Sequence, residues 1–389
     1  MSAPTLRGIT WDHARGLGGL RATAAAYREV RPVVVDWSVR SLQAFADRPV
    51  DELAETFDLL YVDHPAVGYA VAQGCLVAFD ELLDSAALLD QAENSVGRSA
   101  ESYVWEGRRW ALATDGAAQV AAYRPDLMEG AGVAVPRTWA EVPEAADSLK
   151  GAGLQMAMPV VPVDAACSFL ALCPALGEEP FTGEAGEVIS AETGRAALGL
   201  LADLVSRSDP RSFEWNPPGM LDHMSEEDDI AYSPLAFGYS NYARPGFRSH
   251  AVRFAPPPAG PTGKPVGTLG GAGLAVSSRS GAVDECVRYA AFVADPRTQR
   301  GPYFDGGGQP GHRSAWTDDR VNDATSGFFR DTLAALDAAY LRPRYDGYLS
   351  FQDAAGRAVH EFLRAREDPG RTLAHLNQAY RASLLTERV

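Results

Sequence analysis

The chain has 389 residues, which is too long for one compact hydrophobic core and predicts two domains or lobes. Hydrophobic residues make up 46% and charged residues 22%, as in an ordinary soluble globular protein, and no stretch approaches the ~18 consecutive apolar residues of a membrane-spanning helix. The formal net charge of −16 argues against a nucleic acid or an anionic membrane as partner. It does not identify a ligand, because a local pocket can carry either sign.

The N-terminal stretch MSAPTLRGIT lacks the basic region, the apolar region and the small-residue cleavage site of a secretory signal. If Met1 is the native start, we expect a cytoplasmic protein. If the sequence begins after a removed signal, we expect an exported one.

The first third of the chain alternates strand-like and helix-like segments. Strands are expected over residues 6–11, 32–39 and 57–63, and helices over residues 20–30, 41–56 and 65–76. This order predicts a parallel sheet with right-handed crossovers.

The middle of the chain is expected to be mostly helical. In TWAEVPEAADSLK, Thr138 and Glu141 have the spacing of a capping box, which predicts a helix that begins at Thr138. Residues 228–242 are expected to form a strand that leads into an irregular, aromatic-rich loop. Proline- and glycine-rich stretches at 254–278 and 305–316 indicate connections between lobes, and the remainder is again expected to be helical.

Several of these segments resemble the extracellular solute-binding proteins of ABC importers, a family that includes carbohydrate-binding members. The most specific match is YVWEGRRWALATDGAAQVAAYRPDLMEGAGVAVPRTWAEV, residues 103–142. FDLLYVDHPAVGYAVAQGCLVAFDELL, GTLGGAGLAVSSRSGAVDECVRYAAFVADPRTQ and LRPRYDGYLSFQDAAGRAVHEFL resemble other parts of the family's pattern, so the resemblance covers almost the whole chain.

The resemblance implies an α/β, two-lobed fold of the type II periplasmic-binding-protein kind, with the ligand in a cleft between the lobes. It places residues 1–114 plus 256–308 in an N-terminal lobe, and residues 115–255 plus 309–389 in a more helical C-terminal lobe. An ABC permease is the implied partner if the protein is exported. No cofactor is expected.

Two Asp-His pairs follow expected strands, and they are the first candidates for a site. Asp12 and His13 come directly after Trp11, and Asp63 and His64 end the third strand. Because parallel strands end at one edge of a sheet, these side chains are expected to line one cleft. A carboxylate beside an imidazole can hold the ring's tautomer and raise its pKa. The alternative is structural, with Asp63 or His64 capping the helix that begins at Pro65.

The resemblance implies further ligand contacts at Asp115 and in the irregular loop, where Tyr232, Tyr239 and Tyr242 are expected to cluster. From their own chemistry, Trp215 can stack on a ligand, the backbone N–H groups of Gly270 and Gly271 can approach one, and Arg313 can clamp an anionic group. Each has a plain structural alternative, such as a turn Asp, a core aromatic residue, close glycine packing or a salt bridge. These residues are Asp115, Trp215, Tyr232, Tyr239, Tyr242, Gly270, Gly271 and Arg313. Arg342, Arg344 and Tyr345 are interpreted instead as a structural, salt-bridged turn.

Two function classes follow from these observations. The leading hypothesis is a solute-binding protein that closes around a small polar metabolite, such as a sugar, a polyol or a small acid. The alternative is a cytoplasmic enzyme on the same fold, in which His13 or His64 is the general acid or base, Asp12 or Asp63 orients it, and Arg313 holds a substrate carboxylate. A metal held by the Asp-His pairs is not expected, because adjacent residues rarely both bind one ion.

Overall fold

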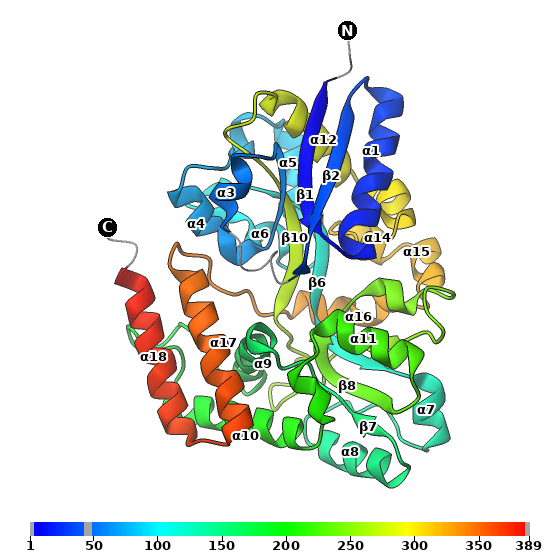
Figure 1. Ribbon diagram of the computed structural model, residues 1–389, viewed down its shortest axis with the longest axis vertical. Coiled ribbons are helices and arrows are strands. Elements are labelled where there is room, and N and C mark those ends of the chain that lie inside the picture. Colours follow the sequence, from blue (N-terminus) through cyan, green and yellow to red (C-terminus); the bar gives the residue numbers. More distant parts are fainter. Residues whose placement is uncertain (1–3, 43–48, 386–389) are drawn as a thin grey trace. The chain divides into compact units, whose positions relative to one another are not determined.

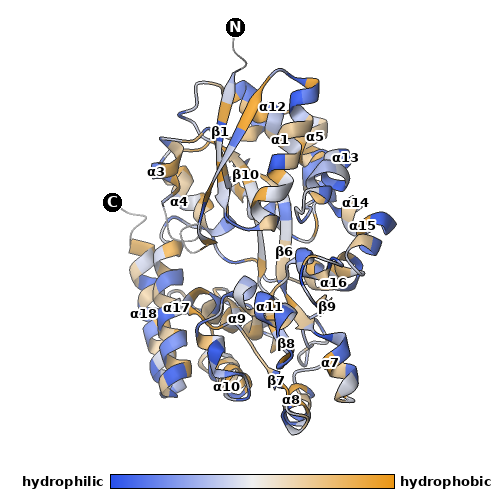
Figure 2. Ribbon diagram, turned by 45° about the vertical axis from the view of Figure 1, so that its right-hand side comes forward, coloured by the Kyte–Doolittle hydropathy of each residue, from blue (hydrophilic) through white to orange (hydrophobic). Residues whose placement is uncertain are grey.

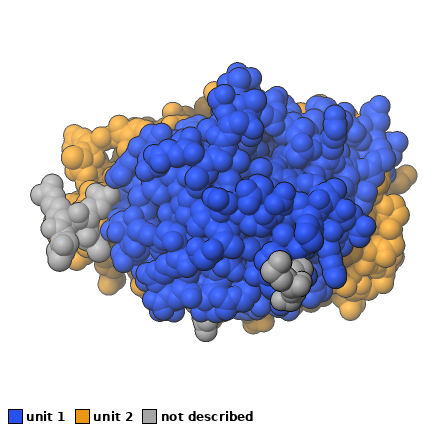
Figure 3. All heavy atoms as spheres, turned by 90° about the horizontal axis from the view of Figure 1, so that it is seen from above, with its two compact units in different colours: residues 1–117, 270–323, 343–346 blue, residues 118–269, 324–342, 347–389 orange. Residues whose placement is uncertain are grey.

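The structure is a computed structural model that describes residues 4–42 and 49–385. Within them the chain forms two compact units (Figure 3). Unit 1 comprises Met1–Ala117, Gly270–Asp323 and Pro343–Asp346, and unit 2 comprises Ala118–Leu269, Ala324–Arg342 and Gly347–Val389.

Unit 1 is built on a sheet with the strand order β2-β1-β3-β10. Strands β1 (Thr5–Trp11) and β2 (Val34–Arg40) run parallel (Figure 1). Strand β3 (Leu59–Val62) is parallel to β1, which confirms the expected parallel arrangement. Strand β10 (Leu269–Val276) runs antiparallel to β3.

The core of unit 1 has two sides, because side chains of a strand alternate between the faces of a sheet. On β3, Leu59 and Tyr61 pack into one cluster with Leu20 and Tyr27 of α1 (Gly19–Val30), and with Cys286 and its neighbours on α12 (Val283–Ala294). Leu60 and Val62 pack into the other cluster, together with residues of α3 (Val50–Ala54) and α4 (Val67–Ala72). The sheet is therefore covered on both faces.

The remaining elements of unit 1 are short. Part of the expected helix 41–56 lies outside the described residues, and α3 is the portion of it that the structure describes after that gap. The short elements are η1 (Ala14–Gly18), η2 (His64–Ala66), η3 (Phe79–Glu81), α5 (Ser85–Asn94), α6 (Ser99–Ser102), β4 (Val104–Trp105), β5 (Arg108–Arg109), α13 (Pro296–Thr298), η6 (Gln299–Tyr303), α14 (Arg313–Trp316) and α15 (Asp319–Ala324).

Unit 2 combines a small sheet with a helical layer. Strand β6 (Leu112–Tyr123) enters the unit at residue 118 and pairs antiparallel with β8 (Ile230–Phe237) and with β9 (Arg253–Ala255), while β7 (Gln155–Met156) runs parallel to β8. Its helices are α7 (Pro125–Gly130), α8 (Val142–Gly151), α9 (Pro162–Ala175), α10 (Ala191–Ser206), η4 (Pro210–Phe213), α11 (Pro217–Glu226), η5 (Ser240–Ala243), α16 (Phe328–Asp337), α17 (Tyr348–Ala365) and α18 (Pro369–Leu385).

Helix α9 is the central helix of unit 2, with α10 and α17 packed against it. All but one of its residues from Asp164 to Ala175 are buried, as expected for a helix that is apolar on every side. Helices α17 and α18 pack against each other and carry hydrophilic as well as hydrophobic faces (Figure 2).

The helix expected to begin at Thr138 was wrong in its start, which lies at Val142. Helix α8 begins only at Val142, and its N-cap residue Glu141 makes no side-chain capping bond. Thr138 instead forms an isolated parallel bridge with Ala259, and the N–H of Trp139 donates to the carbonyl of Ala259. The Glu141 carboxylate still reaches back to this segment, where it accepts the N–H of Arg137 at 2.7 Å and hydrogen-bonds Thr138.

The division into units differs from the expected lobes at residues 115–117, 256–269, 309–323 and 343–346. Residues 256–269 lie in unit 2, where Thr268 pairs with Tyr340. Residues 309–323 lie in unit 1, where Pro310 pairs with Asp115 and the N–H of Gly311 donates to the carbonyl of Thr114. Residues 256–269 are thus bonded to Tyr340 of unit 2, and residues 309–323 are bonded to the part of β6 that lies in unit 1. Along the described chain, no helix is both long and apolar enough to cross a membrane.

Candidate binding site

The ends of β1 and β3 bring the two Asp-His pairs to one edge of the unit 1 sheet. Gly8 pairs with Leu59, and Ile9 with Leu60. Continuing this register by three residues places Asp12 level with Asp63. The negative charge of Asp63 also acts on Asp115, so the three carboxylates belong to one region of unit 1.

The first pair is divided between an exposed acid and a capping histidine. Asp12 is exposed, and its N–H donates to the carbonyl of Arg40 at 2.8 Å. His13 is the N-cap of η1, and its Nδ1 accepts the N–H of Arg15 at 3.0 Å. An Nδ1 that accepts this bond carries no proton, so His13 serves a structural role at this atom.

In the second pair the histidine is buried and the aspartate is partly exposed. His64 is fully buried, and its Nδ1 lies 3.2 Å from Oδ1 of Asp63, whose side chain remains 29% exposed. Asp63 is the N-cap of η2, but its side chain makes no capping bond there. The contact with His64 leaves part of the Asp63 carboxylate at the surface of unit 1.

Beneath these strand ends lies a buried ion pair that the sequence did not predict. The guanidinium of Arg15 binds the Asp115 carboxylate with two hydrogen bonds, Nε to Oδ2 at 2.9 Å and Nη2 to Oδ1 at 2.5 Å. The two side chains are 4% and 0% exposed. Burial raises the pKa of Asp115, and Arg15 and the N–H of Ala272 oppose that shift. The positive charge of Arg15 is thus committed to Asp115.

An aromatic layer supports the ion pair. The Trp11 ring stacks on Tyr61, with centroids 5.6 Å apart and planes 14° from parallel, and the Arg15 guanidinium carbon is 5.9 Å from the Trp11 centroid. The hydroxyl of Tyr61 accepts from Thr114 at 2.9 Å and lies 2.8 Å from the hydroxyl of Tyr303. Burial raises the pKa of Tyr61 far above its ordinary value. Trp11 is only 3% exposed, so its ring is packed inside unit 1 and offers no open surface on which a ligand could stack.

Gly271 packs closely against the backbone of Asp115. Gly271 has φ of +99°, and a Cβ there would lie 2.4 Å from the carbonyl oxygen of Asp115. A residue with a side chain would be strained in this conformation and would collide with β6. This close packing of Gly271 against β6 is the structural alternative, and a ligand contact by Gly270 or Gly271 stays a prediction.

Arg313 opens α14 in unit 1 and is partly exposed. The N-cap of this helix is His312, whose Nδ1 accepts the N–H of Ser314 at 3.1 Å. Arg344 donates from Nε to the carbonyl of Val104 at 2.8 Å, which ties the short segment 343–346 to unit 1.

The candidate aromatic residues of unit 2 do not form one cluster. Tyr232 lies in β8 rather than in the loop and is fully buried. Tyr239 and Tyr242 flank each other at 6.4 Å, and the Tyr242 hydroxyl donates to Asp222 at 2.9 Å. Trp215 is partly exposed and packs against Arg211 and His223.

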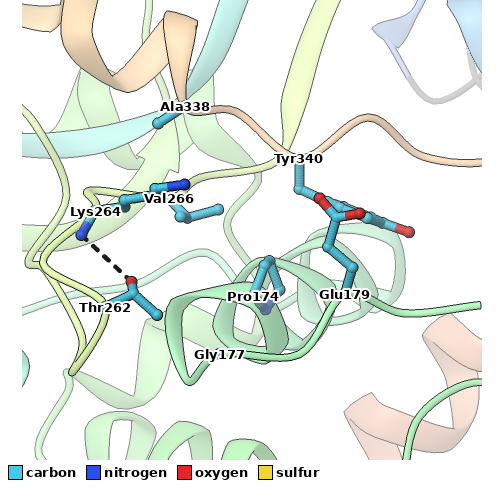
Figure 4. A pocket seen from close by; sticks show the side chains of 8 residues that line it. All are labelled: Pro174, Gly177, Glu179, Thr262, Lys264, Val266, Ala338 and Tyr340. Atoms are coloured by element: carbon cyan, nitrogen blue, oxygen red, sulfur yellow. Dashed lines mark hydrogen bonds between the residues drawn. The ribbon is translucent and has the colours of Figure 1, made fainter. Parts of the chain in front are cut away.

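Unit 2 also contains a cavity of about 220 Å³ that is apart from all the predicted residues (Figure 4). Tyr340 and Glu179 project side by side on one side of it, and Lys264 and Thr262 lie on the other. Its volume is below the ~300–1,000 Å³ of ordinary small-molecule sites, so it is a poor candidate for the main ligand site. Among the described residues, no group of three or more His, Cys, Asp or Glu side chains is placed to hold a metal ion.

The sheets of the two units, with helices packed against them, define an α/β protein. The family model for bacterial extracellular solute-binding proteins matches residues 51–300, and the chain belongs to this family. This confirms the resemblance seen in the sequence. A comparison with curated proteins finds no match.

Solved structures confirm the fold class. The chain is similar to maltose-bound MalE3 of T. maritima, with 19% identity, 97% of this chain and 99% of that chain covered, and a TM-score of 0.83. It is also similar to an ABC transporter solute-binding protein of Agrobacterium radiobacter K84 in complex with ribitol (20% identity, 97% and 98% covered, TM-score 0.82). A third is the GacH receptor of Streptomyces glaucescens, solved unliganded and with acarbose (19% identity, 98% of both chains, TM-score 0.80).

Proposed function

We propose that this solute-binding protein takes a neutral sugar or polyol, and that Asp12 and Asp63 are its main polar contacts in unit 1. The observation that carries the proposal is the exposed Asp12 carboxylate at the end of β1, level with the partly exposed Asp63 at the end of β3. Carboxylates accept hydrogen bonds from hydroxyl groups, and a charged acceptor makes such bonds stronger than a neutral one does.

The charge balance favours a neutral ligand over a small acid. Arg15, the cation beneath the strand ends, already neutralises Asp115 through two hydrogen bonds. An anionic ligand would therefore meet the charges of Asp12 and Asp63 without compensation from Arg15. The similar structures with maltose, ribitol, tagatose and mannitol support the same class of ligand.

The geometry favours binding over acid-base catalysis. The Nδ1 of His13 is engaged in capping η1, and His64 is 0% exposed. A general acid or base must come within hydrogen-bond reach of its substrate, which the burial of His64 opposes. Delivery of the ligand to an ABC permease is part of the proposal only if the protein is exported. The expected cytoplasmic location stays a prediction that cell fractionation can test.

The proposal is tested by measuring the melting temperature (Tm) with maltose, ribitol, mannitol and tagatose, called the sugar panel below. A ligand at about 100 times its Kd adds about 2.7 kcal/mol to the free energy of unfolding, which gives a clear upward shift. Calorimetry then compares the wild type with Asp12→Asn and with Asp36→Asn, a control at an exposed position of β2.

We expect Asp12→Asn to weaken binding of the panel sugar about tenfold and Asp36→Asn to leave it unchanged. Recovery of the sugar intact after long incubation is expected of a binding protein. No shift with any sugar of the panel would overturn the proposed ligand class, and conversion of the sugar would favour the enzyme instead.

A further inference from the structure

The cavity of unit 2 lies at the C-terminal end of α9. Three segments line it: the last turn of α9 with the residues that follow, the loop 260–266, and residues 338–340 after α16 (Figure 4). Its volume is about 220 Å³, and a cavity of about 150 Å³ in another protein holds benzene. On that scale the cavity has room for a molecule of about nine non-hydrogen atoms.

The end of α9 forms the negative side of the cavity. Gly177 has φ of +111°, and its N–H donates to the carbonyl of Pro174 at 3.1 Å, which is a common way for glycine to end a helix. Two residues later, the Glu179 side chain projects beside Tyr340 (Figure 4). The Glu179 carboxylate and the partial negative charge of the helix C-terminus therefore lie on the same side.

Tyr340 is a fixed wall on this negative side. Its N–H donates to the carbonyl of Gly267 at 2.9 Å, and its carbonyl accepts the N–H of Leu269 at 2.8 Å. The residue is only 6% exposed, and burial raises the pKa of its hydroxyl well above the ordinary value. Tyr340 thus stays neutral, with a hydroxyl that can donate or accept a hydrogen bond and a ring that can attract a cation.

The loop 260–266 forms the opposite, positive side. The N–H of Gly263 donates to the carbonyl of Gly260 at 3.0 Å, and the N–H of Lys264 donates to Oγ1 of Thr262 at 3.3 Å. These turns hold Lys264 across the cavity from Glu179 (Figure 4). Within the described part of the chain, neither the Lys264 ammonium group nor the Glu179 carboxylate has an ion-pair partner.

The two opposite charges define the class of ligand. A simple anion would be attracted by Lys264 but repelled by Glu179, and a simple cation would meet the reverse. A neutral sugar would leave both charges without a counter-ion. A zwitterion satisfies both at once, and its apolar part can pack against the side chains of Pro174, Val266 and Ala338.

We propose that this cavity binds a small zwitterionic amino acid of the size of leucine or proline. The Lys264 ammonium group donates to the carboxylate of the amino acid, and the Glu179 carboxylate accepts from its ammonium group, which lies beside the Tyr340 ring. The cavity shares no residue with the proposed sugar contacts, so the inference does not depend on them.

The chain offers a selective spectroscopic probe for this site, because Lys150 and Lys264 are its only two lysines. Reductive methylation with isotope-labelled formaldehyde labels both side chains and keeps their charge, and Lys150→Arg assigns the two NMR signals. Lys150 is exposed in α8 and does not line the cavity. In a titration to millimolar L-leucine or L-proline, we expect the Lys264 signal to shift and saturate while the Lys150 signal stays in place.

Calorimetry then tests the two charges separately. Glu179→Gln and Lys264→Met are compared with Glu144→Gln and Lys150→Met, which remove the same charges from exposed positions of α8. We expect each cavity variant to weaken L-leucine binding about tenfold and each control to leave it unchanged. The Tm of each variant verifies that it is folded. Isocaproate and isopentylamine, which each keep one of the two charges of leucine, are expected to bind about tenfold more weakly than leucine.

Three results would overturn the proposal. The first is that neither amino acid shifts the Lys264 signal. The second is that isocaproate or isopentylamine binds as tightly as L-leucine, since one charge would then be enough. The third is L-leucine binding that survives both cavity substitutions, or that a sugar of the panel competes away, because the amino acid would then bind elsewhere.

Discussion

Arg15 and Asp115 are 100 residues apart in the chain and form a two-point ion pair inside unit 1. The pair joins η1, which follows β1, to the long strand β6. Since Asp115 also accepts the N–H of Ala272 in β10, one carboxylate connects three segments beneath the candidate site. Its main role is therefore to hold the strand ends in place.

Removing one partner of this pair is expected to destabilise the protein strongly. In Arg15→Met, the Asp115 carboxylate stays buried without its cation, and breaking such a pair from one side costs about 3–5 kcal/mol. The measurement is the Tm, compared with that of Arg31→Met. Arg31 pairs with Glu285 but is 43% exposed, so its loss is expected to lower the Tm much less than the loss of Arg15. Equal effects of the two substitutions would contradict the structural role of Arg15.

Gly16 is expected to tolerate no side chain, because Trp11 lies against it. A Cβ at Gly16 would be 2.5 Å from Cδ2 of the Trp11 ring, and the ring is held in turn by its stack on Tyr61. Gly16→Ala is therefore expected to lower the Tm by several degrees and to change the tryptophan fluorescence. The control is Gly130→Ala at the end of α7, where a Cβ would meet no atom within 4 Å, and no loss of stability is expected.

The sequence predicted the strands of unit 1 well, because their apolar runs are continuous and bounded by turns. The ends of β1 and β3, with Asp12 and Asp63, were expected at one sheet edge, and the parallel pairing places them there. The alignment follows from elementary sheet geometry once the order of strands is known.

The sequence could not show the interactions that depend on distant segments. Arg15 was not expected in the site, because no neighbouring residue marks Asp115 as its partner. An aspartate in an apolar run, such as Asp115, requires a cation or several hydrogen-bond donors if it is buried. Tyr232 was assigned to a loop because its neighbours Tyr239 and Tyr242 are in one, yet β8 buries it. The burial of Asp164 in α9 gave no signal, since an acid in the first turn of a helix is common on exposed helices.

The pH dependence of stability is expected to reveal the buried Asp164 of α9. Its pKa in the folded protein is about 7, raised by burial from the ordinary value of 3.8. Between these two values the folded state binds more protons than the unfolded state, so this group lowers the free energy of unfolding as the pH rises. Above pH 7 this loss of unfolding free energy is complete, and below pH 4 Asp164 causes no loss.

Asp164→Asn removes this effect, so the Tm difference between variant and wild type should grow from near zero at pH 4 to several degrees at pH 8. Each kcal/mol moves the Tm by about 2–4 °C in proteins of 150–250 residues. Asp209→Asn should behave in the opposite way, because hydrogen bonds from Arg211 lower the pKa of Asp209. Its stabilising contribution is present above the ordinary pKa and is lost only as the pH falls through the lowered one. The Asp209→Asn deficit should therefore stay constant from pH 5 to pH 8, and a Tm difference for Asp164→Asn that is equally flat would contradict the raised pKa.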